Sequence, residues 1–236
     1  MARHRNLCLP LVLLTAVVAA AACNAGPSVS GTFDRNYKVS GPIRLEITNA
    51  SGDVDITGSA DGKVHVRGDV RASGFGIDNP RKRLDDTVAN PPIEQTGDTI
   101  RIGKEMSRMR NVSIAYAIQV PRDTEVSATV ASGAQTIRGV RGPVKVQAAS
   151  GSIRVEKIER YTQLTTASGS ISATDVGNDL RISSASGSVT VSKVHGDVDV
   201  NALSGVIRIS KPGGRVEAGT ASGDVDIQGA AHDVKA

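Results

Sequence analysis

The sequence predicts an all-β fold, a single-stranded β-solenoid or β-helix whose 18-residue rungs each hold two short strands. The first observation is that Ser-Gly recurs six times at one constant interval, with its serines at positions 132, 150, 168, 186, 204 and 222. The second is that the residues three, five, twelve and fourteen places after each serine are mostly apolar, with polar residues between them. A fixed period indicates stacked units, and an alternation of period two is typical of strands. Rungs stacked about 4.8 Å apart would make the six regular units about 29 Å long.

The Ser-Gly pair is predicted to be the structural turn of each rung, because glycine tolerates backbone conformations that other residues resist. We expect the serine hydroxyls to form a ladder along the stack and the preceding residue, usually alanine, to pack inside the bend. A second turn, marked by glycine or Asn178, follows eight to ten residues later. The predicted turn residues are Ser132, Gly133, Ser150, Gly151, Ser168, Gly169, Ser186, Gly187, Ser204, Gly205, Ser222 and Gly223.

An antiparallel sandwich built from hairpins is the competing fold, because Ser-Gly turns also suit hairpins. Hairpins do not require one period with residue columns in register. The columns therefore favour the solenoid.

An insertion interrupts the array. Residues 43–70 have the same pattern as the later units, but Ser51 does not lie a whole number of repeats before Ser132. We place the insertion at about 71–112. It is predicted to hold one short helix, capped by Asn79 and stopped by Pro91 and Pro92, with Pro80 as its first residue and Leu84 and Val88 on one face. A hairpin over 93–103, turning at Gly97 and Asp98, and a strand over 112–121 follow.

The N-terminus has the features of an export signal: a basic start, an apolar run over 7–22 and small residues at its end. The alternative is an uncleaved membrane helix, but the run is short and contains Pro10. "AAAC" (20–23) resembles the lipobox of bacterial lipoproteins, which implies lipidation of Cys23. We therefore divide the chain into a lipoprotein signal peptide (1–22), a lipidated cysteine with its tether (23–39) and a solenoid domain (40–236).

Charge and cysteine content argue against several protein classes. Removing residues 1–22 lowers the net charge from +4 to +2 and leaves Cys23 as the only cysteine, so the body has no disulfide or thiol nucleophile. The near balance of acids and bases gives no strong field for nucleic acid. The basic "RKR" at 81–83 is interpreted as a solvated helix face beside Asp85 and Asp86 rather than a nucleic-acid patch.

The sequence predicts no catalytic, cofactor-binding or metal-binding residue. The three histidines of the body, His65, His195 and His232, lack the spacing of a zinc pair. A calcium β-roll would need aspartate at a fixed loop position, and here it is only occasional. The aspartates checked for this were Asp53, Asp55, Asp197, Asp199, Asp224 and Asp226. Because Gly-x-Ser-x-Gly is absent as well, we expect no enzyme, with a polysaccharide-active β-helix as the remaining enzymatic alternative.

Residues 116–155 resemble the putative-adhesin β-strand-repeat family of bacterial envelope proteins and are similar to the related head-domain adhesins. The shared pattern is an alternating strand that ends in Val120-Pro121 and is followed by repeated Ser-Gly units. The resemblance extends over about 40–236. It implies a β-helical domain of unknown function at the cell envelope and supplies no catalytic residues, and some members of the family accompany envelope-stress systems.

We therefore expect a non-catalytic, lipid-anchored envelope protein that offers an adhesin-like or structural binding surface. The alternative is an accessory protein of envelope-stress signalling. The expected partners are the membrane, through the lipid, and an envelope or surface ligand, but not nucleic acid. Asn24 rather than Asp follows Cys23. By resemblance to the sorting rules of lipoproteins in bacteria with two membranes, this does not hold the protein at the inner membrane, and we expect an outer-membrane or periplasmic location. We also expect weak self-association through the C-terminal rung, whose last strand would leave backbone groups unpaired.

The anchor can be tested by replacing the modified residue. Cys23→Ser is expected to release the protein from the membrane fraction and to abolish metabolic labelling with palmitate, because no other cysteine remains after cleavage. A Cys23→Ser protein that is processed normally and stays membrane-bound would contradict the lipoprotein prediction.

Overall fold

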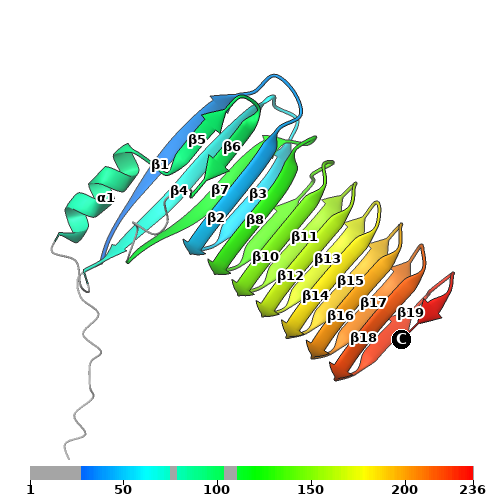
Figure 1. The fold of residues 1–236 in the computed structure, drawn as a ribbon. Coiled ribbons are helices and arrows are strands. Elements are labelled where there is room, and N and C mark those ends of the chain that lie inside the picture. The colour runs from blue at the N-terminus through cyan, green and yellow to red at the C-terminus, as the bar shows by residue number, and fades with distance from the viewer. Residues whose placement is uncertain (1–27, 75–78, 104–110, 236) are drawn as a thin grey trace, which may run out of the picture.

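The computed structural model describes residues 28–74, 79–103 and 111–235, and it confirms the predicted all-β solenoid. Two ten-stranded sheets face each other along an elongated stack, and helix α1 (Pro80–Ala89) lies at the end formed by the N-terminal half of the chain (Figure 1). No helix in these ranges is long and apolar enough to cross a membrane. The predicted signal peptide and Cys23 lie outside the described residues.

The first sheet, sheet A, begins with antiparallel strands and continues with parallel ones. Its order is β1 (Ser28–Lys38), β4 (Lys63–Ser73), β7 (Val112–Pro121), β3 (Val54–Ser59), β9 (Gln135–Arg138), β11 (Ile153–Ile158), β13 (Ile171–Val176), β15 (Val189–Val194), β17 (Ile207–Pro212) and β19 (Val225–Gln228).

The second sheet, sheet B, is parallel except for the hairpin at its N-terminal edge. Its order is β5 (Ile93–Thr96), β6 (Thr99–Ile102), β2 (Arg44–Ser51), β8 (Glu125–Ser132), β10 (Val144–Ser150), β12 (Thr162–Ser168), β14 (Leu180–Ser186), β16 (Val198–Ser204), β18 (Val216–Ser222) and β20 (Val234–Lys235).

Each regular rung contributes one strand to each sheet, and neighbouring rungs pair with an offset of one repeat. Val146 pairs with Leu164 in sheet B, and Val155 pairs with Ala173 in sheet A. The inward columns of the two sheets meet in one core of Val, Ile, Leu and Ala. At the last rung the core is less covered, since Val225 and Ile227 are half-buried and Val234 is exposed.

The insertion is looped out of the stack without breaking it. Ser51 pairs with Ser132 in register, so β2 and β3 form a rung directly below β8 and β9. The chain leaves the solenoid after β3 and returns at β8. The insertion therefore includes β4 and β7 and is longer than the predicted 71–112, because these two strands pair antiparallel and do not share the period of the rungs.

The predicted tether over 23–39 is wrong for most of its length. Ser28–Lys38 is β1, which pairs antiparallel with β4 over its whole length and buries Phe33. The folded body thus begins by Ser28 rather than at residue 40. Its alternating inward positions are Val29, Gly31, Phe33, Arg35 and Tyr37, so Gly31 and Arg35 interrupt the apolar pattern that would mark a strand.

Helix α1 and the hairpin β5–β6, both predicted, cap the core at this end. Asn79 Oδ1 accepts the backbone N–H of Lys82 at 2.9 Å, and Pro80 is the first helical residue. Helix α1 packs against both β1 and β4 of sheet A, with Leu84 buried. An atypical terminal unit of this kind closes the core of a repeat protein.

Aromatic side chains fill the cap where the repeat stops. Phe33 pairs with Gly68, which pairs in turn with Tyr116, so one row crosses β1, β4 and β7. The two rings lie edge to face with their centroids 6.2 Å apart. A Cβ on Gly68 would overlap the Phe33 ring, so the glycine makes room for it. Burial raises the pKa of the Tyr116 hydroxyl well above its ordinary value.

The Ser-Gly corner brings the backbones of successive rungs into close contact. The glycines of seven rungs, Gly52 included, have φ between +113° and +140°, a region that side chains rarely adopt. A Cβ on Gly187 would overlap the carbonyl oxygen of Gly169 one rung away. The Gly169 N–H donates to the Ser186 carbonyl at 3.0 Å, so the corners are joined through the backbone while the serine side chains stand exposed in register.

A second corner, seven residues after each serine, also needs a left-handed backbone. Lys157, Asp175, Lys193 and Lys211 have φ between +52° and +61°, in the column that holds Gly139 and Gly229 elsewhere. The change of direction turns the next residue inward, as with Val176 and Val194, which are buried. The predicted second turn follows this corner, with bends at Gly142, Asn178, Gly196 and Gly214. The left-handed corner itself was not predicted, because lysine and aspartate carry no signal for it.

At the last described rung, β19 pairs only with β17, and β20 pairs only with β18, within residues 28–235. The self-association through this rung stays a prediction.

The Ser-Gly corner can be tested at Gly187. Gly187→Val is expected to lower the free energy of unfolding by at least about 1–3 kcal/mol, the usual cost of such backbone strain. The overlap with Gly169 adds to this cost. Thermal or denaturant unfolding measures the loss. Thr190→Ser, on the exposed face three residues away, is the control and should unfold nearly as the unaltered protein does. Equal stabilities for the two variants would refute the corner.

Candidate functional site

A long shallow trough lies on the outer surface of sheet B. Its volume is about 1070 Å³, and it extends over six rungs, from β2 to β16. Its lining residues are Thr48, Asn49, Ala50, Thr129, Val130, Ala131, Gln147, Ala148, Ala149, Thr165, Thr166, Ala167, Ser183, Ser184, Ala185, Asn201, Ala202 and Leu203. Rungs about 4.8 Å apart make it about 24 Å long between the first and last of these rungs.

The alanine column forms the trough because it points outward, contrary to our expectation. Ala131, Ala149 and Ala167 are exposed, and the residues that fill the bend are the ones before them, such as Ala148 and Thr166. The reason is that the in-and-out alternation of the strand continues up to the alanine, and the turn starts only at the serine. Alanine is the smallest residue with a side chain, so this column leaves the surface hollow.

The lining carries no charge, although 22% of the chain is charged. Hydroxyl and amide side chains form a second column beside the alanines, including Thr129, Thr165 and Asn201. Charged residues return in the next outward column of sheet B, where Arg181 donates to Asp199 at 2.9 Å. The trough is thus a neutral strip of methyl, hydroxyl and amide groups with a charged border. The signal of the trough in the sequence is an uncharged polar residue two places before the alanine, or before Leu203 in the sixth rung.

Three of the aspartates singled out in the sequence make contacts between rungs. Asp53 Oδ1 accepts the Ala134 N–H at 2.8 Å across the Ser-Gly corner. Asp197 Oδ1 accepts the Arg215 N–H of the next rung at 2.8 Å, directly after the second turn at Gly196. Asp55 lies 3.2 Å from Arg138 in an ion pair. These three carboxylates tie one rung to the next.

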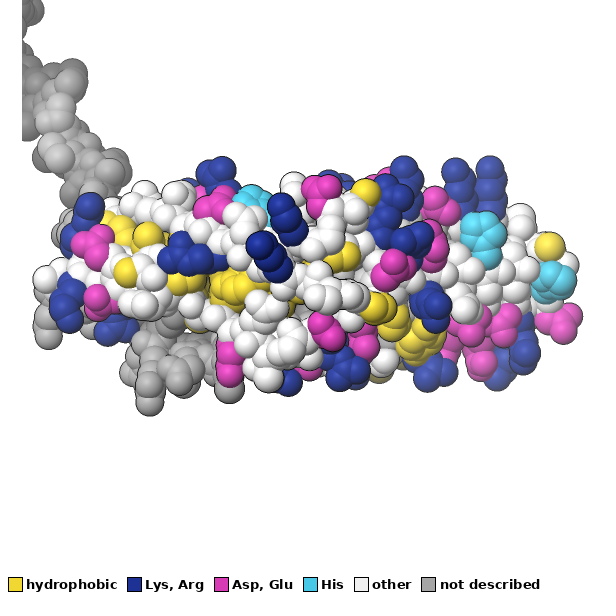
Figure 2. All heavy atoms as spheres, turned by 90° about the horizontal axis from the view of Figure 1, so that it is seen from above, with side chains coloured by type: hydrophobic (Ala, Val, Ile, Leu, Met, Phe, Trp, Pro, Cys, Tyr) yellow, Lys and Arg dark blue, Asp and Glu magenta, His cyan; other side chains and the backbone are white. Residues whose placement is uncertain are grey.

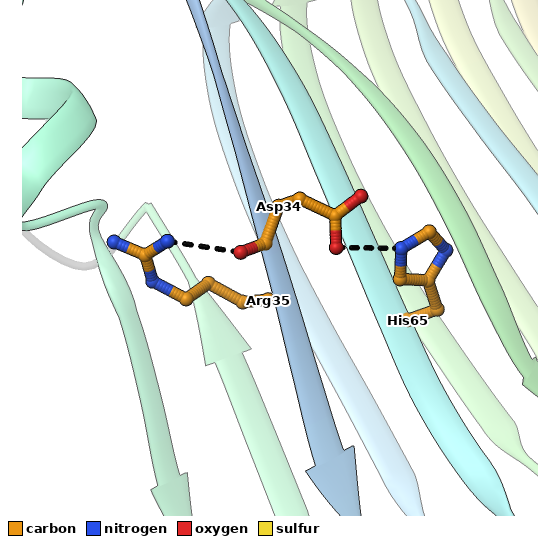
Figure 3. A network of polar contacts seen from close by, with 3 residues as sticks. All are labelled: Asp34, Arg35 and His65. Atoms are coloured by element: carbon orange, nitrogen blue, oxygen red, sulfur yellow. Dashed lines mark hydrogen bonds and ion pairs between the residues drawn. The ribbon is translucent and has the colours of Figure 1, made fainter.

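The histidines lie apart from one another. His65 Nε2 is 2.7 Å from Asp34 Oδ1, between β4 and β1 (Figure 3). His195 Nδ1 lies 3.2 Å from the carbonyl oxygen of Val176 in the rung before it. Among the described residues, no group of three or more His, Cys, Asp or Glu side chains could hold a metal ion.

The "RKR" segment lies on the exposed surface of α1. Arg81 and Lys82 pair with Asp85 and Asp86 one helical turn later, at 3.4 and 3.7 Å. More widely, Figure 2 shows basic and acidic side chains interspersed along the face in view rather than gathered into one field.

The family model described as Toastrack DUF4097 matches residues 44–235, which is every solenoid rung and the insertion. The chain belongs to this family. A search of the curated proteins finds no significant match.

The solved structures to which the chain is similar are distant in sequence. One is a "putative cell adhesion protein" from Clostridium sporogenes, with 10% identity, a TM-score of 0.41, and coverage of 85% of this chain and 99% of that chain. Another is a "putative adhesin" from Bacteroides fragilis, with 15% identity, a TM-score of 0.39, and coverage of 84% and 94%. A third is a "putative lipid binding protein" from Parabacteroides distasonis, with 10% identity, a TM-score of 0.30, and coverage of 87% and 97%.

The contribution of the aspartate contacts between rungs can be tested at Asp197. Asp197→Ala is expected to lower the free energy of unfolding by about 1 kcal/mol, the typical net value of one hydrogen bond, because the Arg215 N–H loses its acceptor. Thermal unfolding measures the change. Asp224→Ala is the matched control, since Asp224 contributes only its backbone carbonyl to the contacts between rungs. An Asp197→Ala protein as stable as this control would contradict the role.

Proposed function

We propose that the protein is a non-catalytic, lipid-anchored envelope protein that binds an extended, uncharged glycan chain along the trough. The observation that carries the proposal is the trough itself, a neutral strip repeated over six rungs. An open concave surface of this length suits a polymer better than a small molecule, which is usually enclosed on most sides.

Charge argues for a neutral ligand. A charged polymer gains most from opposite charges at its contacts, and none of the lining residues is ionisable. Side chains such as Gln147, Ser183 and Asn201 can instead donate to and accept from hydroxyl groups. The alanine methyl groups beside them offer contact to the apolar faces of sugar rings.

Spacing argues against an extended peptide. Same-face residues of a strand recur about every 6.6–6.8 Å, whereas the rungs recur about every 4.8 Å, so a peptide along the trough would lose register. The backbone groups of the trough strands already pair between rungs, as between β10 and β12, and are unavailable to a peptide. A glycan needs only side-chain contacts. The trough has no aromatic residue, so we expect many weak contacts rather than one strong one.

The envelope location and the absence of a reaction belong to the same proposal. The apolar segment that ends in "AAAC" supports export and anchoring at Cys23. Asp53, Asp55 and Asp197 are engaged in contacts between rungs, and the neutral trough offers no acid, base or nucleophile beyond ordinary hydroxyls. A binding surface therefore fits these residues better than a polysaccharide-active enzyme.

The trough can be tested by filling it. Ala149→Arg combined with Ala167→Arg places two long, charged side chains in its middle. We expect affinity electrophoresis to show retardation of the unaltered protein by at least one neutral polysaccharide among dextran, mannan and a β-glucan. The double variant should bind the same polysaccharide with an apparent affinity about tenfold or more lower.

The control is Thr190→Arg together with Ser172→Arg, which adds the same charge to the outward face of sheet A. It should bind like the unaltered protein. Equal binding by both double variants would exclude the trough. Retardation by the acidic polymer alginate alone, or by none of the neutral polymers, would overturn the choice of ligand.

A further inference from the structure

Only four residues separate the predicted lipidation site, Cys23, from Ser28, the first residue of β1. An extended chain spans at most about 3.6 Å per residue, so the five steps from Cys23 to Ser28 reach at most about 18 Å. Ser28 is paired with Ser73 of β4 and is therefore fixed to the folded body. The lipid would hold this end of sheet A close to the membrane surface.

Helix α1 starts at the same end. Gly31 of β1 lies beside Leu84, in the middle of α1. Arg35, further along the strand, donates to the carbonyl oxygens of Val88 and Ala89 at 3.2 and 3.0 Å. β1 and α1 thus run in the same direction, and their first residues lie at one end of the molecule (Figure 1).

Three exposed cations surround this end, and we call them the basic end: Arg71 near the last residue of β4, and Arg81 and Lys82 in the first turn of α1. The side chains of Arg81 and Lys82 are 71% and 75% exposed. Their partners, Asp85 and Asp86, lie four residues further along the helix, about 6 Å further from the tip.

The order of charges on α1 is not the one that stabilises a helix. The macrodipole favours acids in the first turn and bases in the last, and α1 has neither. The i,i+4 pairs also run from base to acid, the weaker orientation. The placement of Arg81 and Lys82 is therefore better explained by something that lies beyond the tip.

We propose that the basic end docks onto the anionic phospholipid headgroups around the lipid anchor, so that the rungs project away from the membrane. The inference rests on the proposed anchor at Cys23. An anionic surface attracts nearby Lys and Arg, and the attraction acts over about 8 Å at physiological ionic strength. The short tether would keep the basic end close to the membrane surface, so docking would cost little additional translational entropy. The acids one turn back stay further from the surface and oppose docking less.

The test uses the lipidated protein in vesicles of phosphatidylcholine, with or without phosphatidylglycerol, and energy transfer to a lipid-bound dye. The mature chain has no cysteine besides the lipidated one, so a fluorophore on Ser30→Cys or on Gln228→Cys labels one site at either end. We expect transfer from residue 30 to exceed transfer from residue 228, and the ratio to rise in the anionic vesicles. A ratio that does not change with phosphatidylglycerol would overturn the proposal.

A charge reversal locates the effect. Arg71→Glu, Arg81→Glu and Lys82→Glu together should remove the response to phosphatidylglycerol. The matched control, Lys193→Glu, Arg208→Glu and Lys211→Glu, makes the same change of charge on exposed positions of later rungs and should keep the response. If both triple variants lose it equally, the effect is one of net charge, and the basic end has no specific role.

Failure of the anchor and failure of docking are distinguishable. Palmitate labelling of Cys23 reports on the anchor alone. The Cys23→Ser protein, sedimented with the same vesicles, reports on the basic end alone, and we expect about fivefold loss of binding for each cation removed. Binding of this protein that is equal on both kinds of vesicle refutes docking, whatever the labelling shows.

Discussion

The close approach of backbones at the Ser-Gly corner is the constraint on which the rest of the molecule depends. At each of these corners a Cβ would overlap a backbone carbonyl oxygen of the adjacent rung, as a Cβ on Gly151 would overlap that of Gly133. No side chain can enter there, so the distance between rungs is set by the backbone itself. Every rung must then return to the same corner after the same path. This explains why Ser51, although not a whole number of repeats before Ser132, still falls into the column once the insertion is looped out.

A fixed path also dictates what can fill the core. Only a few inward positions per strand face the opposite sheet, and the side chains there must match from rung to rung. Val, Ile, Leu and Ala satisfy this, while aromatic residues do not fit a regular rung. They appear where the repeat ends: Phe33 and Tyr116 fill the cap, and Tyr161, on a regular rung, is exposed. The uniform core and the uncharged outer trough both follow from strict repetition, one inside the sheet and one outside.

The parts of the fold that repeat could be predicted, and the parts that do not repeat were partly missed. The columns of the rungs, the helix capped by Asn79 and the hairpin at Gly97 each have a local pattern in the sequence. β1 was mistaken for a tether, because Gly31 and Arg35 occupy inward positions that an isolated strand would fill with apolar residues. Both residues serve α1: the helix packs on Gly31, and Arg35 donates a hydrogen bond to the carbonyl oxygen of Ala89 at its end. The trough was missed for a different cause: whether Ala149 points in or out depends on where the strand stops, a question of one residue.

The repeated rungs and the non-repeating cap suit different kinds of contact. A group on a regular rung occurs again on the next rung, so a contact made there is weak, multiplied and suited to a polymer. A group in the cap occurs once, so its position relative to Cys23 is unique and can set an orientation. The trough belongs to the first kind and the basic end to the second. A ligand along the trough would lie parallel to the stack and touch several rungs. A surface that meets the basic end would fix the direction in which that stack points.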